Sequence, residues 1–247
     1  MQSVDDNHRC LVLNQASSVP ISIVVISQKN LWRRWTLNCG LAEFFGIGIA
    51  AMIAVLHRNL FGEPDQGLEY AVNLLFMLMA GLIEGIIVGY FQWRVLKVKF
   101  RAVSRSRWIF LTALGAVIAW FLGVLPSIMM SQGSSEIPPS DAEPPLVVMA
   151  LLGGLMGGVL GALWGGLQLI ELRKHIQSSK KWILANALGW LVGLAIIMLA
   201  ASWPDEATSW QTILLLGVVS GLLAGLSVGA ITGWFLIRLE QSKEPGG

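Results

Sequence analysis

Two acidic residues, Glu43 and Glu84, stand inside long apolar stretches where ionised groups are rare. Glu43 follows Trp35 by eight residues, and Glu84 precedes Trp93 by nine. In a helix that rises about 1.5 Å per residue, both carboxyl groups would lie about 12–14 Å from the same edge of the membrane. Because the hydrocarbon core of a bilayer is about 30 Å thick, this spacing predicts that both acids lie near its middle and can face each other.

A carboxyl group at that depth offers a specific chemistry. A charged side chain at the bilayer centre costs about 2.5–3.5 kcal/mol on insertion scales, so such a residue is usually functional or neutralised. Two adjacent carboxyl groups can share a proton, hold a cation, or bind a pigment or the arginine of a partner. The alternative is that both acids are protonated, hydrogen-bonded to neighbouring groups, and part of the packing. Both interpretations are open at this point.

The remaining reactive residue types lack a catalytic or metal-binding arrangement. None of His8, His57 and His175 has metal-ligand spacing with another histidine or with a cysteine. Cys39 falls within an apolar stretch and far from Cys10, which argues against a disulfide framework. The sequence contains no nucleophile–base pair, phosphate-binding loop or redox motif. We therefore expect no enzyme, no metal centre and no nucleic-acid partner.

Composition indicates which elements hold the two acids. The chain of 247 residues is 55% hydrophobic and 13% charged, with a mean hydropathy of +0.66, whereas soluble domains carry about 25% charged residues. This is typical of a polytopic protein in a lipid bilayer. A transmembrane helix needs about 20 apolar residues, and the sequence predicts an all-α fold with six such helices. The predicted spans are 35–56, 68–93, 108–130, 146–172, 182–203 and 210–239.

Positive charge is distributed unevenly between the two sides of these spans. All but one of the 17 lysines and arginines lie on one side, and the exception is Arg58. The positive-inside rule then places both terminal tails, 1–31 and 241–247, in the cytoplasm. Tryptophans at the ends of spans typically anchor the bilayer interface. The predicted interface anchors are Trp35, Trp93, Trp108 and Trp182.

The chain also repeats. Three spans open with a basic residue and a tryptophan, and small residues then recur every four positions on both helices of each unit. This pattern predicts three helical hairpins in the same orientation, 32–104, 105–178 and 179–240, whose small faces let helices approach closely. The predicted helix-packing glycines are Gly46, Gly81, Gly85, Gly89, Gly115, Gly157, Gly161, Gly165, Gly189, Gly193, Gly221, Gly225 and Gly229.

The acids belong to the first unit alone. The positions that align with Glu43 hold Ala116 and Trp190. Those that align with Glu84 hold a leucine and an alanine, at 160 and 224. Because two units repeat the pattern without acids, the fold does not require them.

The repeated unit resembles a known family. Its basic residue and tryptophan, its glycine-rich span, and the motif G-x3-G-x3-G-x2-Q-W-x2-L at 81–96 resemble a polytopic repeat family common in cyanobacteria and related bacteria. The first unit keeps the Gln-Trp pair at Gln92, but in the second Gln168 precedes leucine and the third has Thr232. The resemblance implies a thylakoid or plasma membrane and no established activity.

Two further features have alternative interpretations. Trp120, Trp164 and Trp190 lie inside spans, either as packing or as flat surfaces that stack on a carotenoid, chlorophyll or quinone. The basic loop 94–107 is either topogenic or a site for anionic lipid or an acidic partner. The polar, proline-rich loop 131–144 is expected to be a flexible connector.

Two functions follow as hypotheses. The first is a non-catalytic accessory, assembly or scaffold subunit of a membrane complex, with helix faces that bind protein, lipid or pigment. The second is a small proton- or cation-coupled transporter or channel that uses Glu43 and Glu84. Only Thr36, Asn38 and Asn73 offer nearby polar groups, which is little for a pathway. A polar cavity that reaches the acids would favour transport, and a dry, glycine-packed centre would favour the scaffold.

Overall fold

The structure is a computed structural model that describes residues 27–62, 67–132, 145–176, 180–204 and 207–239. The tails 1–26 and 240–247, and most of the loop 131–144, lie outside the described residues, so the predictions for them are not addressed. The described residues form six α-helices: α1 (Gln28–Phe61), α2 (Gly67–Lys99), α3 (Arg105–Gln132), α4 (Leu146–Leu172), α5 (Lys180–Ala201) and α6 (Trp210–Leu236).

All six helices are long and apolar enough to cross a bilayer. Their spans run from 21 to 34 residues, with a mean hydropathy of 2.1 to 2.3 in the most apolar window. The predicted six-span, all-helical fold is confirmed. Several helices extend beyond the apolar core at polar ends, where local caps stabilise them. The hydroxyl of Ser27, for example, accepts a hydrogen bond from the backbone N–H of Asn30 at the start of α1.

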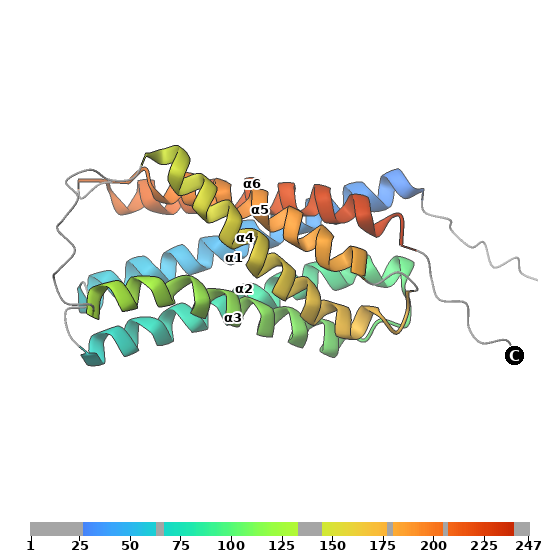
Figure 1. Ribbon diagram of the computed structural model, residues 1–247, viewed down its shortest axis with the longest axis horizontal. Coiled ribbons are helices and arrows are strands. Elements are labelled where there is room, and N and C mark those ends of the chain that lie inside the picture. The colour runs from blue at the N-terminus through green and yellow to red at the C-terminus, as the bar shows by residue number, and fades with distance from the viewer. Residues whose placement is uncertain (1–26, 63–66, 133–144, 177–179, 205–206, 240–247) are drawn as a thin grey trace, which may run out of the picture.

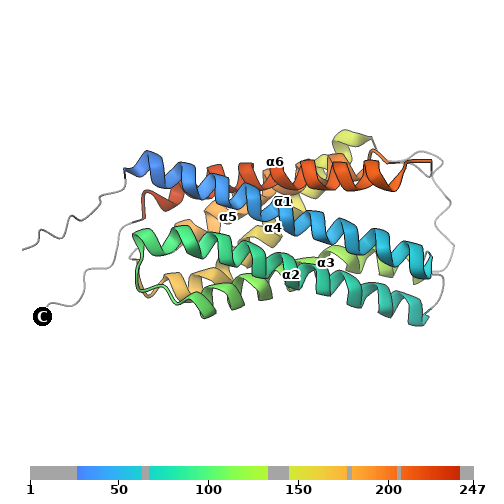
Figure 2. The same cartoon turned by 180° about the vertical axis from the view of Figure 1, so that it is seen from behind.

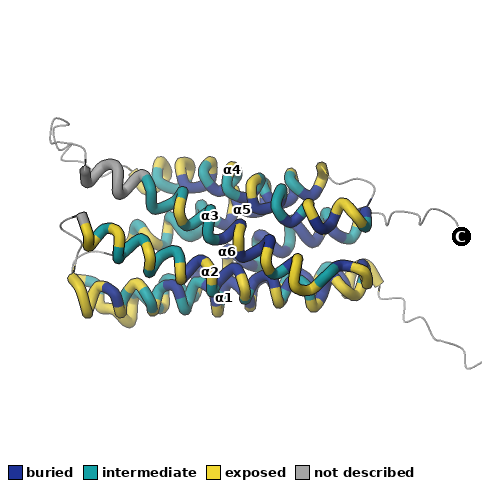
Figure 3. Tube along the Cα trace, turned by 90° about the horizontal axis from the view of Figure 1, so that it is seen from below, coloured by how far each residue is buried: buried dark blue, intermediate teal, exposed yellow. Residues whose placement is uncertain are grey.

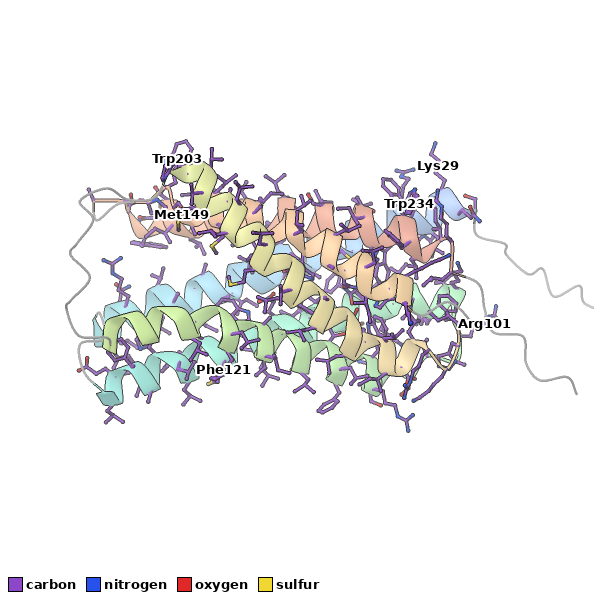
Figure 4. The ribbon with its side chains drawn as sticks, in the orientation of Figure 1. Lys29, Arg101, Phe121, Met149, Trp203 and Trp234 are labelled. Carbon is purple, nitrogen blue, oxygen red and sulfur yellow. The ribbon has the colours of Figure 1, made fainter. Side chains whose placement is uncertain are left out.

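The helices run up and down and close into a ring (Figures 1 and 2). Each packs against its neighbours in the chain, and α6 packs against α1. Packing is most extensive for α4 with α5, α6 with α1, and α2 with α3, and least extensive between α3 and α4. We call the end where α1 begins and α6 ends the terminal end, and the other the opposite end. Lys29 and Arg101 lie at the terminal end (Figure 4).

The tightest interfaces join one repeat to the next, because the second helix of each hairpin packs its glycine face on the first helix of the following hairpin. The third hairpin packs in the same way on the first. At equivalent positions, a Cβ added to the glycine would lie 2.7 Å from the Cβ of its neighbour, in the pairs Gly85–Ala116, Gly161–Trp190 and Gly225–Glu43. The aligned positions therefore occupy equivalent places around an approximate threefold axis.

The other glycines of the repeat pattern also lie against a neighbouring helix. A Cβ at Gly46 would lie 2.8 Å from the Cγ of Glu84, and one at Gly115 would lie 3.0 Å from the indole ring of Trp164. Such distances leave no room for a larger side chain without movement. The same holds, with different neighbours, for Gly81, Gly89, Gly157, Gly165, Gly193, Gly221 and Gly229, and contact is looser at Gly189.

The tryptophans that open the repeats pack inside the bundle. Trp35, Trp108 and Trp182 have no exposed surface. The ring of Trp182 lies 5.9 Å from that of Trp35 and 6.2 Å from that of Trp108, centroid to centroid. We call these three residues the tryptophan cluster. The prediction that they anchor the bilayer interface is wrong, because packing around the threefold axis turns their rings inward, together with Leu96, Leu172 and Leu236.

Other tryptophans have the exposure that an interface residue needs. Trp203 is 77% exposed at the opposite end, and Trp234 is 48% exposed near the terminal end (Figure 4). Trp93 is partly buried, and the ammonium group of Lys97 lies 4.4 Å from its ring centroid. Its role as an anchor stays a prediction. Buried residues concentrate in the middle and the terminal half of the bundle, while the opposite end is more exposed (Figure 3).

Candidate functional site

The structure brings Glu43 of α1 and Glu84 of α2 together. Each is only 2% exposed, and their carboxyl groups are hydrogen-bonded to each other. We call them the acid pair. A hydrogen bond between two carboxyl groups requires a proton on one of them. With one proton the acid pair carries a single negative charge, and with two protons it is neutral.

Glycines on two helices make room for these side chains. A Cβ at Gly225 of α6 would lie 2.7 Å from both the Cβ and the Cγ of Glu43, and Gly46 of α1 is in similar contact with Glu84. Residues larger than glycine at these positions would displace the acids. The repeat pattern therefore also forms the compartment in which the acid pair lies.

A third side chain completes the hydrogen bonding of Glu84. The indole Nε1 of Trp120, on α3, donates to Oε2 of Glu84 at 2.6 Å. A short hydrogen bond of this kind stabilises negative charge on the accepting oxygen. By contrast, Oε2 of Glu43 is buried without a hydrogen-bond partner among the described residues. The sequence marked Trp120 as a candidate for stacking, but it did not indicate this contact.

A chain of buried polar groups leads from the acid pair toward the terminal end. The thiol of Cys39 lies one turn before Glu43 and hydrogen-bonds to Gln92. The amide nitrogen of Gln168 donates to Oε1 of Gln92 at 2.9 Å and to the hydroxyl of Thr112 at 3.0 Å. The indole of Trp182 donates to Oε1 of Gln168 at 3.1 Å. We call these five residues the axial polar chain, and it ends at the tryptophan cluster.

The third repeat joins this region through Thr232, which aligns with Gln92 and Gln168. Its hydroxyl accepts a hydrogen bond from the indole of Trp35 at 2.8 Å. Only Trp108 of the tryptophan cluster leaves its indole N–H without a partner among the described residues. Gln168 and Thr232 of the repeat motif thus each bind a tryptophan that opens a repeat, whereas Gln92 binds Gln168.

A central cavity of about 370 Å³ extends from the acid pair toward the opposite end. Residues of α1 to α5 line it, mostly alanine, leucine, isoleucine, methionine and tryptophan. Glu84 is the only ionisable residue among the described residues of the lining. The cavity reaches the acid pair, as the transport hypothesis required, but its walls are apolar.

Three tryptophans form much of the aromatic wall. Trp164 of α4 and Trp190 of α5 stack, with ring centroids 5.0 Å apart and planes 17° from parallel. Both line the central cavity together with Trp120 of α3. The sequence identified these residues separately, and the structure places them around one space. The wall also includes residues of both α3 and α4, the neighbouring helices that contact each other least.

A third buried carboxyl group, which sequence reasoning missed, lies at the terminal end. Glu171 accepts a hydrogen bond from the backbone N–H of Ser104 at 3.0 Å and binds the ammonium group of Lys174 at 2.7 Å. The imidazole of His175 lies 3.6 Å from the same carboxyl group. The sequence signal for this cluster was the i, i+3 and i+4 spacing of Glu171, Lys174 and His175, which places them on one face of a helix. These contacts join the end of α4 to the loop before α3, a structural role.

A lysine of α2, Lys99, connects this helix to the end of α6 at the terminal end. The ammonium group of Lys99 donates to the carbonyl oxygens of Leu236 at 2.8 Å and Ile237 at 3.0 Å. These carbonyl groups end α6, where a cation stabilises the negative end of the helix dipole. Within the described residues, no group of three or more histidine, cysteine, aspartate and glutamate side chains is placed to hold a metal ion.

Searches of protein-family models, curated proteins and solved structures found no match to this chain.

Proposed function

We propose that this protein is a non-catalytic integral membrane protein that holds a lipid-soluble molecule in its central cavity, as an accessory, assembly or scaffold subunit of a membrane complex. The observation that carries the proposal is the cavity itself. It lies among α1 to α5, its lining is apolar apart from Glu84, and three tryptophans form part of its wall. Apolar cavities of this kind stay dry and take up apolar molecules.

The interior argues against a hydrated pathway. A path for ions or polar solutes needs polar groups along its length. Toward the terminal end, the axial polar chain is occupied by its own hydrogen bonds and is followed by the buried tryptophan cluster. Toward the opposite end, the cavity lining is apolar. These features favour holding a molecule over conducting one.

The proposal includes an orientation. Among the described residues, the lysines and arginines lie toward the terminal end, with the exception of Arg58 at the opposite end. We infer that both termini lie in the cytoplasm of a bacterial cell, with the helices in the plasma membrane or in a thylakoid membrane. Labelling single cysteines at positions 2 and 207, in a background without native cysteines and in intact cells that carry the protein in the plasma membrane, tests this. The proposal requires that only position 207 reacts with an impermeant reagent.

The cavity is tested by filling it. A Cβ at Gly123, which lines the cavity, would meet no atom within 4 Å, so leucine at this position would begin in open space. Gly166 of α4 is equally open but lies outside the lining, and Gly166→Leu is the matched control. We expect a lipid-soluble molecule to copurify with the wild type and with Gly166→Leu after gentle extraction, and to be lost from Gly123→Leu. Mass spectrometry and absorption spectroscopy of the extracts measure this.

The subunit role is tested by the same extraction. Native gel electrophoresis from native membranes should show migration with a larger multisubunit or pigmented complex. A lone monomer or small homo-oligomer would contradict the subunit role, while a copurified molecule would still support the cavity.

The alternative is a small proton- or cation-coupled transporter, and the acid pair favours it. Two hydrogen-bonded carboxyl groups in the middle of the membrane can exchange a proton for a cation. If this is the function, liposomes with the wild type will show a proton or cation flux that Glu43→Gln and Glu84→Gln each abolish. Equal flux in the wild type and both variants would remove this alternative.

A further inference from the structure

We propose that the central cavity binds a lipophilic organic cation, a molecule with an apolar or aromatic body and one quaternary or protonated ammonium group. This inference rests on the proposed function, because it names the class of molecule that the cavity holds. Its basis is the combination of one carboxyl group with apolar and aromatic walls.

The charge of the site matches one positive charge. Glu84 lines the cavity, and its hydrogen bond to Glu43 leaves one negative charge on the acid pair when one proton is shared. The indole of Trp120 holds the oxygen of Glu84 in place. In a space without water, attraction between opposite charges is much stronger than in solvent. A ligand with a single cationic group would compensate the charge of the acid pair.

The aromatic rings favour an ammonium group over other cations. Tryptophan is the best side chain for cation–π contact, which recognises quaternary ammonium groups. The N–H edge of Trp120 bonds to Glu84, so a cation–π contact in this cavity would use the ring faces of Trp120, Trp164 or Trp190, all of which line it. The stacked pair Trp164 and Trp190 offers a second flat surface for the body of the ligand.

The size and the lining favour this class of molecule over other simple occupants. An apolar cavity of about 150 Å³ holds benzene, so about 370 Å³ accommodates a ring with a substituted ammonium group. A metal ion such as Ca²⁺ takes six to eight oxygen ligands, which the described lining does not supply. A neutral hydrocarbon would leave the negative charge of the singly protonated acid pair without a counterion.

The arrangement of the helices suggests how such a molecule enters. The cavity is bounded by α3 and α4, whose mutual contact is the least extensive in the ring. Figure 1 shows α4 crossing the bundle at an angle to α3. A lipid-soluble cation would pass from the bilayer between these helices and reach Glu84 without crossing the tryptophan cluster.

Two probes of one shape test the inference. Benzyltrimethylammonium and neopentylbenzene differ in having nitrogen or carbon at one position, so only the charge changes. Binding is measured calorimetrically with the full chain in nanodiscs, with empty nanodiscs as the blank. We expect the wild type to bind the cation at least about tenfold more tightly than the hydrocarbon. Glu84→Gln should lose this preference but still bind the hydrocarbon, which shows that its cavity is intact.

Two glycine variants separate this inference from the proposed function. Gly123→Leu should lose both probes, and Gly166→Leu should bind both as the wild type does. If the wild type binds the hydrocarbon as tightly as the cation, the cation inference is overturned and the proposed cavity function stands. If Glu84→Gln keeps the preference for the cation, the assignment to Glu84 is overturned. Binding of neither probe by the wild type would overturn both proposals.

Discussion

The terminal half and the opposite half of the bundle are built from the same glycine-spaced helices but have different interiors. In the terminal half, the tryptophan cluster and the axial polar chain fill the axis, and most of their polar groups are paired. In the opposite half, the axis holds a cavity lined mainly by small and apolar side chains. The comparison teaches that one backbone pattern can form a packed core or a binding space, according to the side chains that it directs inward.

The acid pair lies at the boundary between these two halves. It contacts the axial polar chain through Cys39 on one side and the central cavity through Glu84 on the other. Since the aligned positions in the second and third hairpins hold no acid, the carboxyl groups of this boundary come from the first hairpin alone. The asymmetry gives the cavity one charged wall and several neutral ones.

The largest expected effect comes from removing part of the tryptophan cluster. Trp182→Ala deletes a fully buried ring that contacts Trp35 and Trp108 and donates to Gln168. We expect a loss of about 3–5 kcal/mol in the free energy of unfolding in detergent. Trp210→Ala, at a ring that is 54% exposed, is the control and should change it by less than about 1 kcal/mol. Similar losses for both variants would contradict a packed terminal half.

Substitutions at two glycines test the packing at the interface between repeats. A Cβ at Gly161 would collide with the carbonyl oxygen of Asn186 and the Cβ of Trp190, whereas one at Gly123 would meet nothing. Gly161→Leu should therefore destabilise the bundle by about 3 kcal/mol or prevent folding, because the obstacle is backbone. Gly123→Leu should fold normally. Thermal unfolding and size-exclusion chromatography in detergent measure both, and equal stability of the two variants would refute the assigned packing.

A smaller effect is expected when the axial polar chain is interrupted. Gln168→Leu removes the bonds to Gln92, Thr112 and Trp182 and leaves their polar atoms buried. We expect a loss of about 1–2 kcal/mol, since hydrogen bonds within membranes average about 0.6 kcal/mol each and unpaired groups add to the cost. Unfolding in detergent measures the loss. Gln168→Glu is the control for side-chain volume. It keeps the shape of glutamine and the oxygen that accepts from Trp182, but it removes the amide nitrogen that donates to Gln92 and Thr112.

The smallest effect concerns the terminal surface. Glu171→Gln weakens the contacts to Lys174 and His175 but keeps an acceptor for the backbone of Ser104. We expect a loss of about 0.5–1 kcal/mol, because the Lys174 side chain is 42% exposed and solvent screens the pair. The difference from the wild type should shrink further at 1 M salt. A loss of the same size at low and high salt would contradict a screened ion pair between Glu171 and Lys174.

Several features of the site could be read from the sequence because they depend on helix geometry alone. The meeting of Glu43 and Glu84 follows from their similar distance from one end of two neighbouring helices of a hairpin, while their depth in the bilayer stays a prediction. The contact of Trp120 with Glu84 could not be read, because it depends on how the second hairpin rotates against the first. The inward direction of Trp35 could not be read either, since an interfacial depth is compatible with facing lipid or the axis.

The sequence by itself determined the six membrane-spanning helices and the equivalence of the three hairpins, because hydropathy and four-residue spacing are local properties of the chain. Only the tertiary structure decided that the glycine faces join consecutive hairpins into a closed ring, that Trp35, Trp108 and Trp182 face the axis, and that a cavity reaches Glu84. The physical reason is that these features depend on the rotation of each helix about its own axis. Packing against two neighbours fixes that rotation, and lipid, which is as apolar as the side chains, does not.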